Sequence, residues 1–164
     1  MILITDVKYD EDNHTAKAVG VLFENWTDER HVRSHYVILD GFGPYVPGEF
    51  YKRELPCLLS LLEEIPEPLE AIIVDGYVDL EQDHPGLGRH LYNAISQKTM
   101  VIGIAKSRYA SANAIQILRG DSKNPLHVTS TQDVEVISQK VKSMAGPYRL
   151  PYMVKLVDQL TREI

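Results

Sequence analysis

Three acidic residues occupy positions at which a carboxylate could bind a ligand or a metal: Asp6, Glu54 and Asp75. Asp75 follows the apolar run 71–74 and precedes Gly76, so it ends a predicted buried strand. Ligands and metals collect at the carboxyl ends of strands in open α/β sheets. An Asp-Gly pair after a strand is also a common turn, and for this dipeptide alone that alternative stays open.

Asp6 and Glu54 have contexts that could bring them to Asp75. Asp6 lies inside the predicted first strand, 1–9, where a charge is costly unless it is paired or binds a metal. The alternative is an acid facing outward from an edge strand. Glu54 lies in the predicted helix 49–63, where an exposed, salt-bridged acid is the alternative. Lys106 ends another predicted buried strand, either as an ion-pair partner or as a phosphate ligand.

The elements that must position these residues follow a simple order. Two alternating stretches read as a hairpin and a third strand follows, then a helix, then alternating strands and helices. This order predicts an α/β fold: a mixed sheet with three antiparallel leading strands followed by parallel strands, flanked by helices. The expected strands are 1–9, 15–23, 30–39, 71–75, 99–105, 112–118 and 125–129, and the expected helices are 49–63, 85–97, 131–144 and 151–162.

Length and composition exclude several classes of protein. The 164 residues suffice for one domain, so we expect a single domain over 1–164. No apolar run is long enough to cross a bilayer, so no membrane partner is expected. The single cysteine, Cys57, excludes an internal disulfide and suits a reducing cytoplasm. The net charge of −6 argues against coating nucleic acid through bulk charge, but not against an enzyme with local basic groups.

The stretch 41–50 packs glycines and prolines around aromatic residues and cannot be regular structure throughout. Tyr45 has little near it in sequence that would bury it. The stretch is either a simple connection closed by aromatic packing or a stiff protrusion that inserts into a partner. No histidine or cysteine set has zinc spacing, because His31 and His35 fall in a predicted strand.

An acid on the first strand, one on the first helix and one ending the fourth strand resemble the ribonuclease H-like fold. Within that fold the chain resembles the endonuclease V family, the deaminated-base repair nucleases. The motifs that carry the resemblance are Pro44-Tyr45-Val46-Pro47-Gly48, Arg53-Glu54-Leu55-Pro56, Ile72-Ile73-Val74-Asp75-Gly76, Gly86-Leu87-Gly88-Arg89-His90-Leu91, Ile102-Gly103-Ile104-Ala105-Lys106-Ser107 and Arg149-Leu150-Pro151.

The resemblance implies roles for these residues. Asp6, Glu54 and Asp75 would be catalytic carboxylates that bind Mg²⁺ or Mn²⁺, hard cations that prefer oxygen ligands. Lys106 would support the scissile phosphate. Family members cleave a phosphodiester near hypoxanthine in DNA or RNA, and flipping a mispaired deaminated base is inexpensive. The implied substrate-binding residues are Tyr45, Pro47, Gly48, Gly76, Glu81 and His84.

Two departures from the family pattern concern histidines. Where the family has a histidine six residues after the aspartate, this chain has Glu81, and His84 lies three residues later. Gln132 stands where the family has a second histidine. Both changes alter charge or proton-transfer capacity at the periphery of the site.

Three hypotheses follow from the sequence. The first is a metal-dependent nuclease of this family. The second is a nucleic-acid-binding homologue with weak or lost catalysis. The third is an unrelated small-molecule α/β enzyme or nucleotide binder, which the absence of Gly-x-Gly-x-x-Gly and phosphate-loop motifs disfavours. The choice between DNA and RNA, the preferred base and the oligomeric state stay open.

Overall fold

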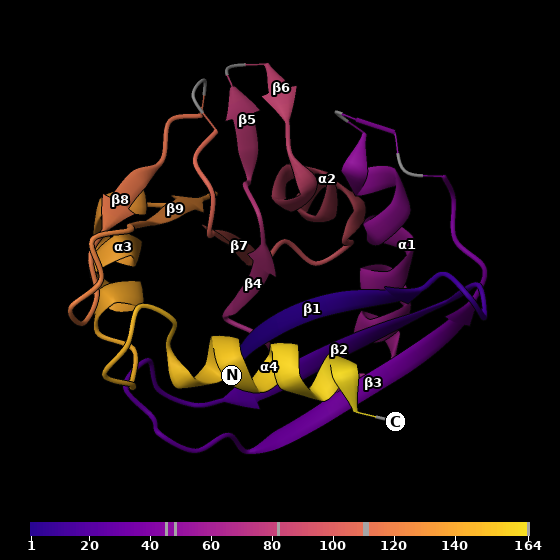
Figure 1. Ribbon diagram of the computed structural model, residues 1–164, viewed down its shortest axis with the longest axis horizontal. Coiled ribbons are helices and arrows are strands. Elements are labelled where there is room, and N and C mark those ends of the chain that lie inside the picture. Colours follow the sequence, from indigo (N-terminus) through magenta and orange to yellow (C-terminus); the bar gives the residue numbers. More distant parts are fainter. Residues whose placement is uncertain (45, 48, 82, 110–111, 164) are drawn as a thin grey trace.

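The computed structural model describes residues 1–44, 46–47, 49–81, 83–109 and 112–163. Four helices and nine strands occupy this part of the chain, in three runs of three strands, of which the first two are each followed by one helix and the last by two (Figure 1). The elements are β1 (Ile2–Asp10), β2 (Thr15–Phe23), β3 (Arg33–Asp40), α1 (Phe50–Glu63), β4 (Ala71–Asp75), β5 (Asp79–Glu81), β6 (His84–Pro85), α2 (Leu87–Ala94), β7 (Met100–Ala105), β8 (Ile115–Ile117), β9 (Leu126–Ser130), α3 (Val134–Lys142) and α4 (Tyr152–Arg162).

Seven strands form one mixed sheet in the order β3-β2-β1-β4-β7-β9-β8. The leading strands β1, β2 and β3 pair antiparallel, and β4 pairs parallel with both β1 and β7. This confirms the predicted mixed α/β sheet. The last two strands differ from the expectation of parallel pairing, because β9 is antiparallel to both β7 and β8.

The hairpin of β1 and β2 closes through its own turn residues. The carboxylate of Asp10 accepts hydrogen bonds from the backbone N–H groups of Asp12 and Asn13. His14 adopts a positive φ of 53°, which reverses the chain before β2 begins. The reversal sets the register that pairs Asp6 with Val19.

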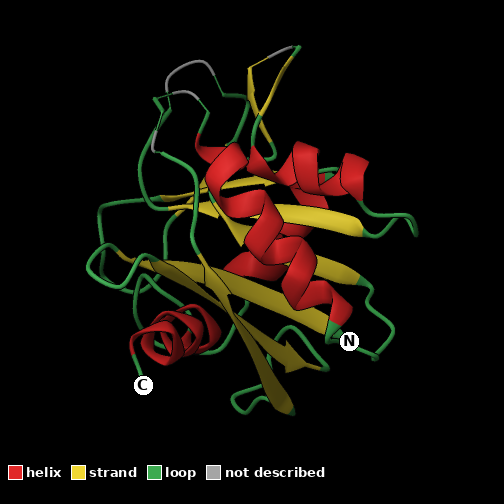
Figure 2. Ribbon diagram, turned by 90° about the vertical axis from the view of Figure 1, so that its right-hand side faces the viewer, coloured by secondary structure: helices red, strands yellow, loops and turns green. Residues whose placement is uncertain are grey.

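Helices cover both faces of the sheet (Figure 2). Leu58 of α1 and Leu87 and Leu91 of α2 pack in one apolar cluster with sheet residues that include Leu3 and Ile72. The second face packs against the last two helices through the residues Ile137, Val141, Met153, Val154 and Val157. Because both faces are buried, the central strands β4 and β7 are apolar up to Asp75 and Ala105, as their sequences predicted.

Three elements differ in detail from the expectation. Residues 79–85, expected as an acidic segment leading into a helix, contain the small hairpin of β5 and β6. Helix α2 is shorter than the predicted 85–97, because Gly86 and Ile95 flank it in extended conformation. Pro56, a residue type that suggests either a first-turn boundary or a kink, lies inside α1. No helix in the described ranges is long and apolar enough to span a membrane.

Candidate functional site

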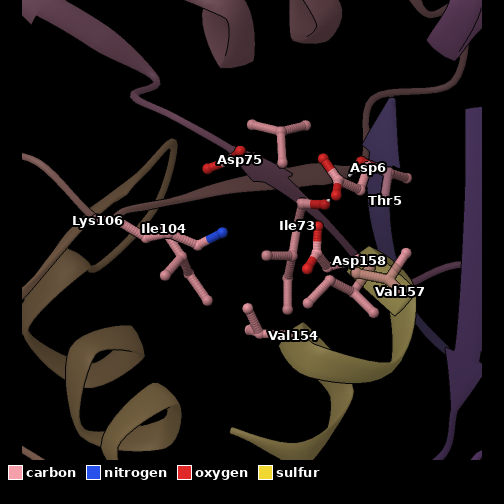
Figure 3. Close-up of a pocket in the computed structure, with 11 residues that line it drawn as sticks. Thr5, Asp6, Ile73, Asp75, Ile104, Lys106, Val154, Val157 and Asp158 are labelled. Carbon is pink, nitrogen blue, oxygen red and sulfur yellow. Dashed lines mark hydrogen bonds between the residues drawn. The ribbon is translucent and has the colours of Figure 1, made fainter. Parts of the chain in front are cut away.

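A small cavity of about 20 Å³ lies where the central strands end, and Asp6, Asp75 and Lys106 all line it. Asp6 comes from β1, Asp75 ends β4, and Lys106 directly follows β7. Figure 3 shows these side chains around the same space, with Asp158 of α4 beside them. The structure therefore brings together three residues that the sequence predicted, and adds a fourth polar residue.

The strand ends are fixed by tight backbone contacts. The Thr5 hydroxyl donates a hydrogen bond of 2.9 Å to the carbonyl of Ile73, which ties β1 to β4 directly beside Asp6. Gly76 follows Asp75 with a φ of +127°, a conformation that favours glycine. A Cβ on Gly103 would lie 2.3 Å from the Gly76 carbonyl oxygen, so glycine is also needed where β7 approaches this turn.

Glu54 is the third predicted carboxylate, and it reaches the same region from α1. Its side chain is only 4% exposed, and its Oε2 has no hydrogen-bond partner among the described residues. Glu54 does not line the cavity itself. Burial raises its pKa well above the usual value, and repulsion from Asp75 and Asp6 adds to the rise. A buried, unpartnered carboxylate facing two others is costly unless a cation or proton compensates it.

The pKa values of Asp6 and Asp75 are raised as well, again by burial from water. Desolvation, then repulsion from Asp75, raises the pKa of Asp6 to about 6, although the Val7 backbone N–H donates to its carboxylate. The pKa of Asp75 is also raised, mainly by desolvation, although this side chain at the strand end stays open to solvent. Lys106 opposes both rises. The site therefore carries an excess of negative charge that disfavours full ionisation.

Asp158 is the site residue that sequence reasoning missed. It lies on α4 in the cavity lining with Val154 and Val157, and it forms a 2.9 Å ion pair with Arg162. Its only sequence signal is its spacing, since it falls one turn after the buried Val154 on the face that packs against the sheet.

The predicted substrate-binding residues lie in several places. Tyr45 and Gly48 fall outside the described residues, and Pro47 between them is exposed. Glu81 and His84 pair at 3.1 Å across the hairpin of β5 and β6. They line a separate hollow of about 750 Å³, not the cavity that holds Asp6 and Asp75.

The loop that contains Tyr45 is anchored at its base by an aromatic stack. The Arg53 guanidinium lies 3.9 Å from the ring centre of Tyr9 and 4.4 Å from that of Phe42. Arg53 also pairs with Glu11 at 2.6 Å. Because Arg53 neighbours Glu54 in α1, this stack connects the start of the loop to the helix that carries the buried carboxylate. Cys57 is buried beside them, and its pKa is raised to about 11, so it is no nucleophile.

The donor set fits a hard divalent cation in its chemistry, because it consists of carboxylate oxygens with like-charge repulsion to relieve. Within the described ranges, however, no three His, Cys, Asp or Glu side chains form a ready metal-binding group. The described geometry thus shows convergence of acids on one cavity without a closed coordination shell.

A family profile and curated relatives both relate this chain to the endonuclease V family. The sequence profile of the endonuclease V family matches residues 1–146. An endonuclease V from Xanthomonas axonopodis pv. citri is 28% identical over 178 aligned residues, covering 94% of this chain and 73% of the relative. One from Xylella fastidiosa is 32% identical over 103 residues, covering 63% of this chain and 42% of the relative. This chain thus spans less than half the length of the Xylella protein that it matches.

Solved structures share the fold. Endonuclease V from Streptomyces avermitilis superposes with a TM-score of 0.77 at 23% identity, covering 98% of this chain and 79% of that one. Endonuclease V from Ciona intestinalis, solved with a 24mer DNA containing an inosine followed by a ribo-adenosine, gives a TM-score of 0.77 at 18% identity, covering 98% and 84%. The profile match covers most of the sequence, and we conclude that the chain belongs to the endonuclease V family.

Proposed function

We propose that this chain is a divalent-metal-dependent endonuclease that hydrolyses a phosphodiester near a deaminated base, inosine, in DNA or RNA. Residues 1–164 act as one endonuclease V-like domain. The observation that carries the proposal is the meeting of Asp6, Asp75 and Lys106 at one cavity in a chain of this family. The inosine-containing DNA bound to the Ciona relative supports the substrate class.

The cofactor in this proposal is Mg²⁺ or Mn²⁺, held by Asp6, Glu54 and Asp75 with Asp158 beside them. The unpartnered Oε2 of Glu54 and the raised pKa values of Asp6 and Asp75 support this assignment, because a bound cation would compensate all three acids. When bound, the cation supplies a polarised phosphate and a water of lowered pKa.

The chain's own residues position the substrate and stabilise the negative charge on the scissile phosphate. The Lys106 ammonium faces the carboxylates and stabilises the negative charge that develops on the scissile phosphate. Tyr45, Pro47 and Gly48 separate the strands beside the flipped base, and of these Pro47 is exposed. Gly76 lets the nucleic-acid backbone approach closely, because it has no side chain. Glu81 and His84 contact the substrate from the hairpin of β5 and β6.

The test is a nicking assay on an inosine-containing oligonucleotide with Mg²⁺ or Mn²⁺. Asp75→Asn removes a charged ligand and preserves shape, so we expect cleavage to fall at least about a hundredfold. Asp12→Asn, in the exposed turn after β1, is the matched control and should cleave like the wild type. Equal cleavage by wild type and Asp75→Asn would contradict the proposal.

A second candidate is a nucleic-acid-binding homologue with weak or no catalysis, acting in the cytoplasm like the first, as the lone Cys57 suggests. The observation that favours this candidate is the replacement of two family histidines by Glu81 and Gln132. Binding of the inosine oligonucleotide without cleavage at any Mn²⁺ concentration would select it.

A further inference from the structure

We infer that Arg149 is a positioning residue that holds Lys106 and the start of α4 in place around the carboxylate cavity. This inference rests on the proposed function for its catalytic meaning. Its structural basis is a set of hydrogen bonds that connects the segment after β7 with the connection between α3 and α4. The first of these segments begins with Lys106, and the second leads into α4, which carries Asp158.

Among the described residues, the hydrogen bonds that Arg149 donates all go to backbone carbonyls. Its Nη2 donates to the carbonyl of Lys106 at 2.5 Å and to that of Pro125 at 2.9 Å. Its Nε donates to the carbonyl of Asn124 at 3.0 Å. No carboxylate among the described residues pairs with it. The single guanidinium, with several donors in one plane, therefore links the end of β7 to the turn before β9.

A second arginine fixes the segment from which Arg149 projects. Arg119 is 5% exposed. Its guanidinium donates to five backbone carbonyls across the connection between α3 and α4: Lys142, Met144, Gly146, Tyr148 and Arg149. A buried charge with so many acceptors imposes one conformation on the connection, because alternatives would leave its donors unpaired. Arg119 thus fixes the backbone of Arg149, and the Arg149 side chain extends from it to the Lys106 carbonyl.

Helix α4 begins at Tyr152, directly after this connection. The Tyr152 N–H donates to the Ala145 carbonyl at 2.9 Å, which closes the connection onto the helix start. The helix then presents Val154, Val157 and Asp158 to the cavity. The same hydrogen-bond set that holds the Lys106 backbone therefore also sets the position from which Asp158 projects.

Tyr77 holds the segment after Lys106 through two further hydrogen bonds. Its hydroxyl donates to the Ser107 carbonyl at 2.6 Å and accepts from the Tyr109 N–H at 2.9 Å. Tyr77 lies two residues after Asp75 in the chain. The segment after β7 is thus held both by Tyr77, which follows β4, and by Arg149, which precedes α4.

This anchoring matters because Lys106 makes no ion pair among the described residues, so its backbone fixes where the flexible side chain begins. A lysine at position 149 could reach one carbonyl but could not serve three acceptors in a plane. Loss of the Arg149 hydrogen bonds should therefore make the backbone at Lys106 and the start of α4 more mobile. We expect this mobility to weaken stabilisation of the transition state more than it weakens substrate binding.

The experiment compares Arg149→Met, Arg149→Lys and the control Arg30→Met, an exposed arginine in the loop before β3. Hydrogen exchange is measured on the full chain for peptides covering 105–109 and 152–158. Steady-state kcat and KM are measured on an inosine oligonucleotide with Mn²⁺. For Arg149→Met we expect faster exchange in both peptides and a kcat lowered about tenfold or more, with KM changed less than about threefold. Arg149→Lys should recover part of both effects, and Arg30→Met should match the wild type.

Two outcomes would overturn the inference. One is unchanged exchange in both peptides. The other is a lower melting temperature for Arg149→Met with an unchanged kcat per folded molecule, which would make Arg149 purely structural. A wild type that cleaves no substrate would refute the proposed function instead, and the exchange measurement would still decide whether Arg149 orders the two segments.

Discussion

Four carboxylates surround the site, and each has different neighbours. Glu54 is buried with one oxygen unpartnered, Asp6 accepts from the Val7 N–H, and Asp158 pairs with Arg162. Asp75 lies open at the strand end near Lys106. A bound cation would therefore stabilise the four carboxylates to different degrees. The stabilisation should be largest for Glu54, because its side chain is buried from water.

The residue-scale prediction concerns Asp158. Asp158→Asn should lower kcat/KM for the inosine oligonucleotide about tenfold to a hundredfold, because it removes a negative charge that faces the cavity. Asparagine retains the shape and the helix, so the melting temperature should change little. The matched control is Arg162→Met, which breaks the ion pair on the exposed side and leaves Asp158 in place. If both variants lose the same activity, the ion pair and not the cavity explains the role of Asp158.

How far single residues could be predicted depended on the element that carries them. Asp6, Asp75 and Lys106 could be found because a charge in or after a buried apolar strand is conspicuous. Asp158 could not, because an acid on an amphipathic helix is usually solvated, and only the packing of α4 against the sheet turns it toward the cavity. Arg149 belongs to one of the motifs that carried the family resemblance, but its hydrogen bonds could not be predicted, since backbone carbonyl acceptors have no residue type.

At the scale of elements, the strands and helices were predictable wherever a clear period or apolar run existed. The hairpin of β5 and β6 was not, because its three-residue and two-residue strands are too short to show alternation. The antiparallel direction of β9 was not predictable either, since its apolar sequence suits either pairing. That hairpin carries Glu81 and His84, which line a hollow separate from the carboxylate cavity.

The element-scale prediction tests the charge of Glu81. In an Asp75→Asn background, in which we expect no cleavage, Glu81→Gln should tighten binding of an inosine oligonucleotide about twofold to fivefold at low salt. Glutamine can still accept a hydrogen bond from His84, so the hairpin should keep its form. Fluorescence anisotropy at two salt concentrations measures the effect, which should shrink as salt rises. Glu63→Gln, at the end of α1, is the control. Equal gains in both variants would indicate bulk charge and not the hairpin.

At the scale of the whole molecule, the acids of the site are part of the stability of the fold. They project from β1, α1, β4 and α4, so folding brings together like charges that the unfolded chain keeps apart. The apolar clusters on both faces of the sheet oppose this repulsion. The cavity therefore links the protonation state of the protein to its free energy of unfolding.

The whole-molecule prediction follows from that linkage. Asp75, Asp158 and Lys106 face Asp6, and burial with the repulsion from Asp75 raises its pKa from 3.8 to about 6. A raised pKa means that the folded state binds the proton more tightly than the unfolded state. The stability from this group is therefore fully present below pH 4 and is lost as the pH rises through 6. For Asp6 alone the loss is at most about 3 kcal/mol.

Without divalent cations, the free energy of unfolding measured in urea should therefore fall between pH 5 and pH 7, and it should fall less in Asp6→Asn. At pH 7.5, Mn²⁺ should restore the loss and raise the melting temperature, whereas at pH 5 protons already occupy the site and the rise should be smaller. Asp10→Asn is the control, because Asp10 lies exposed at the other end of β1 and its pKa is lowered, so its contribution has the opposite sign. A Mn²⁺-induced rise that is equal at both pH values, or unchanged in Asp6→Asn, would show that the cation binds elsewhere than at these carboxylates.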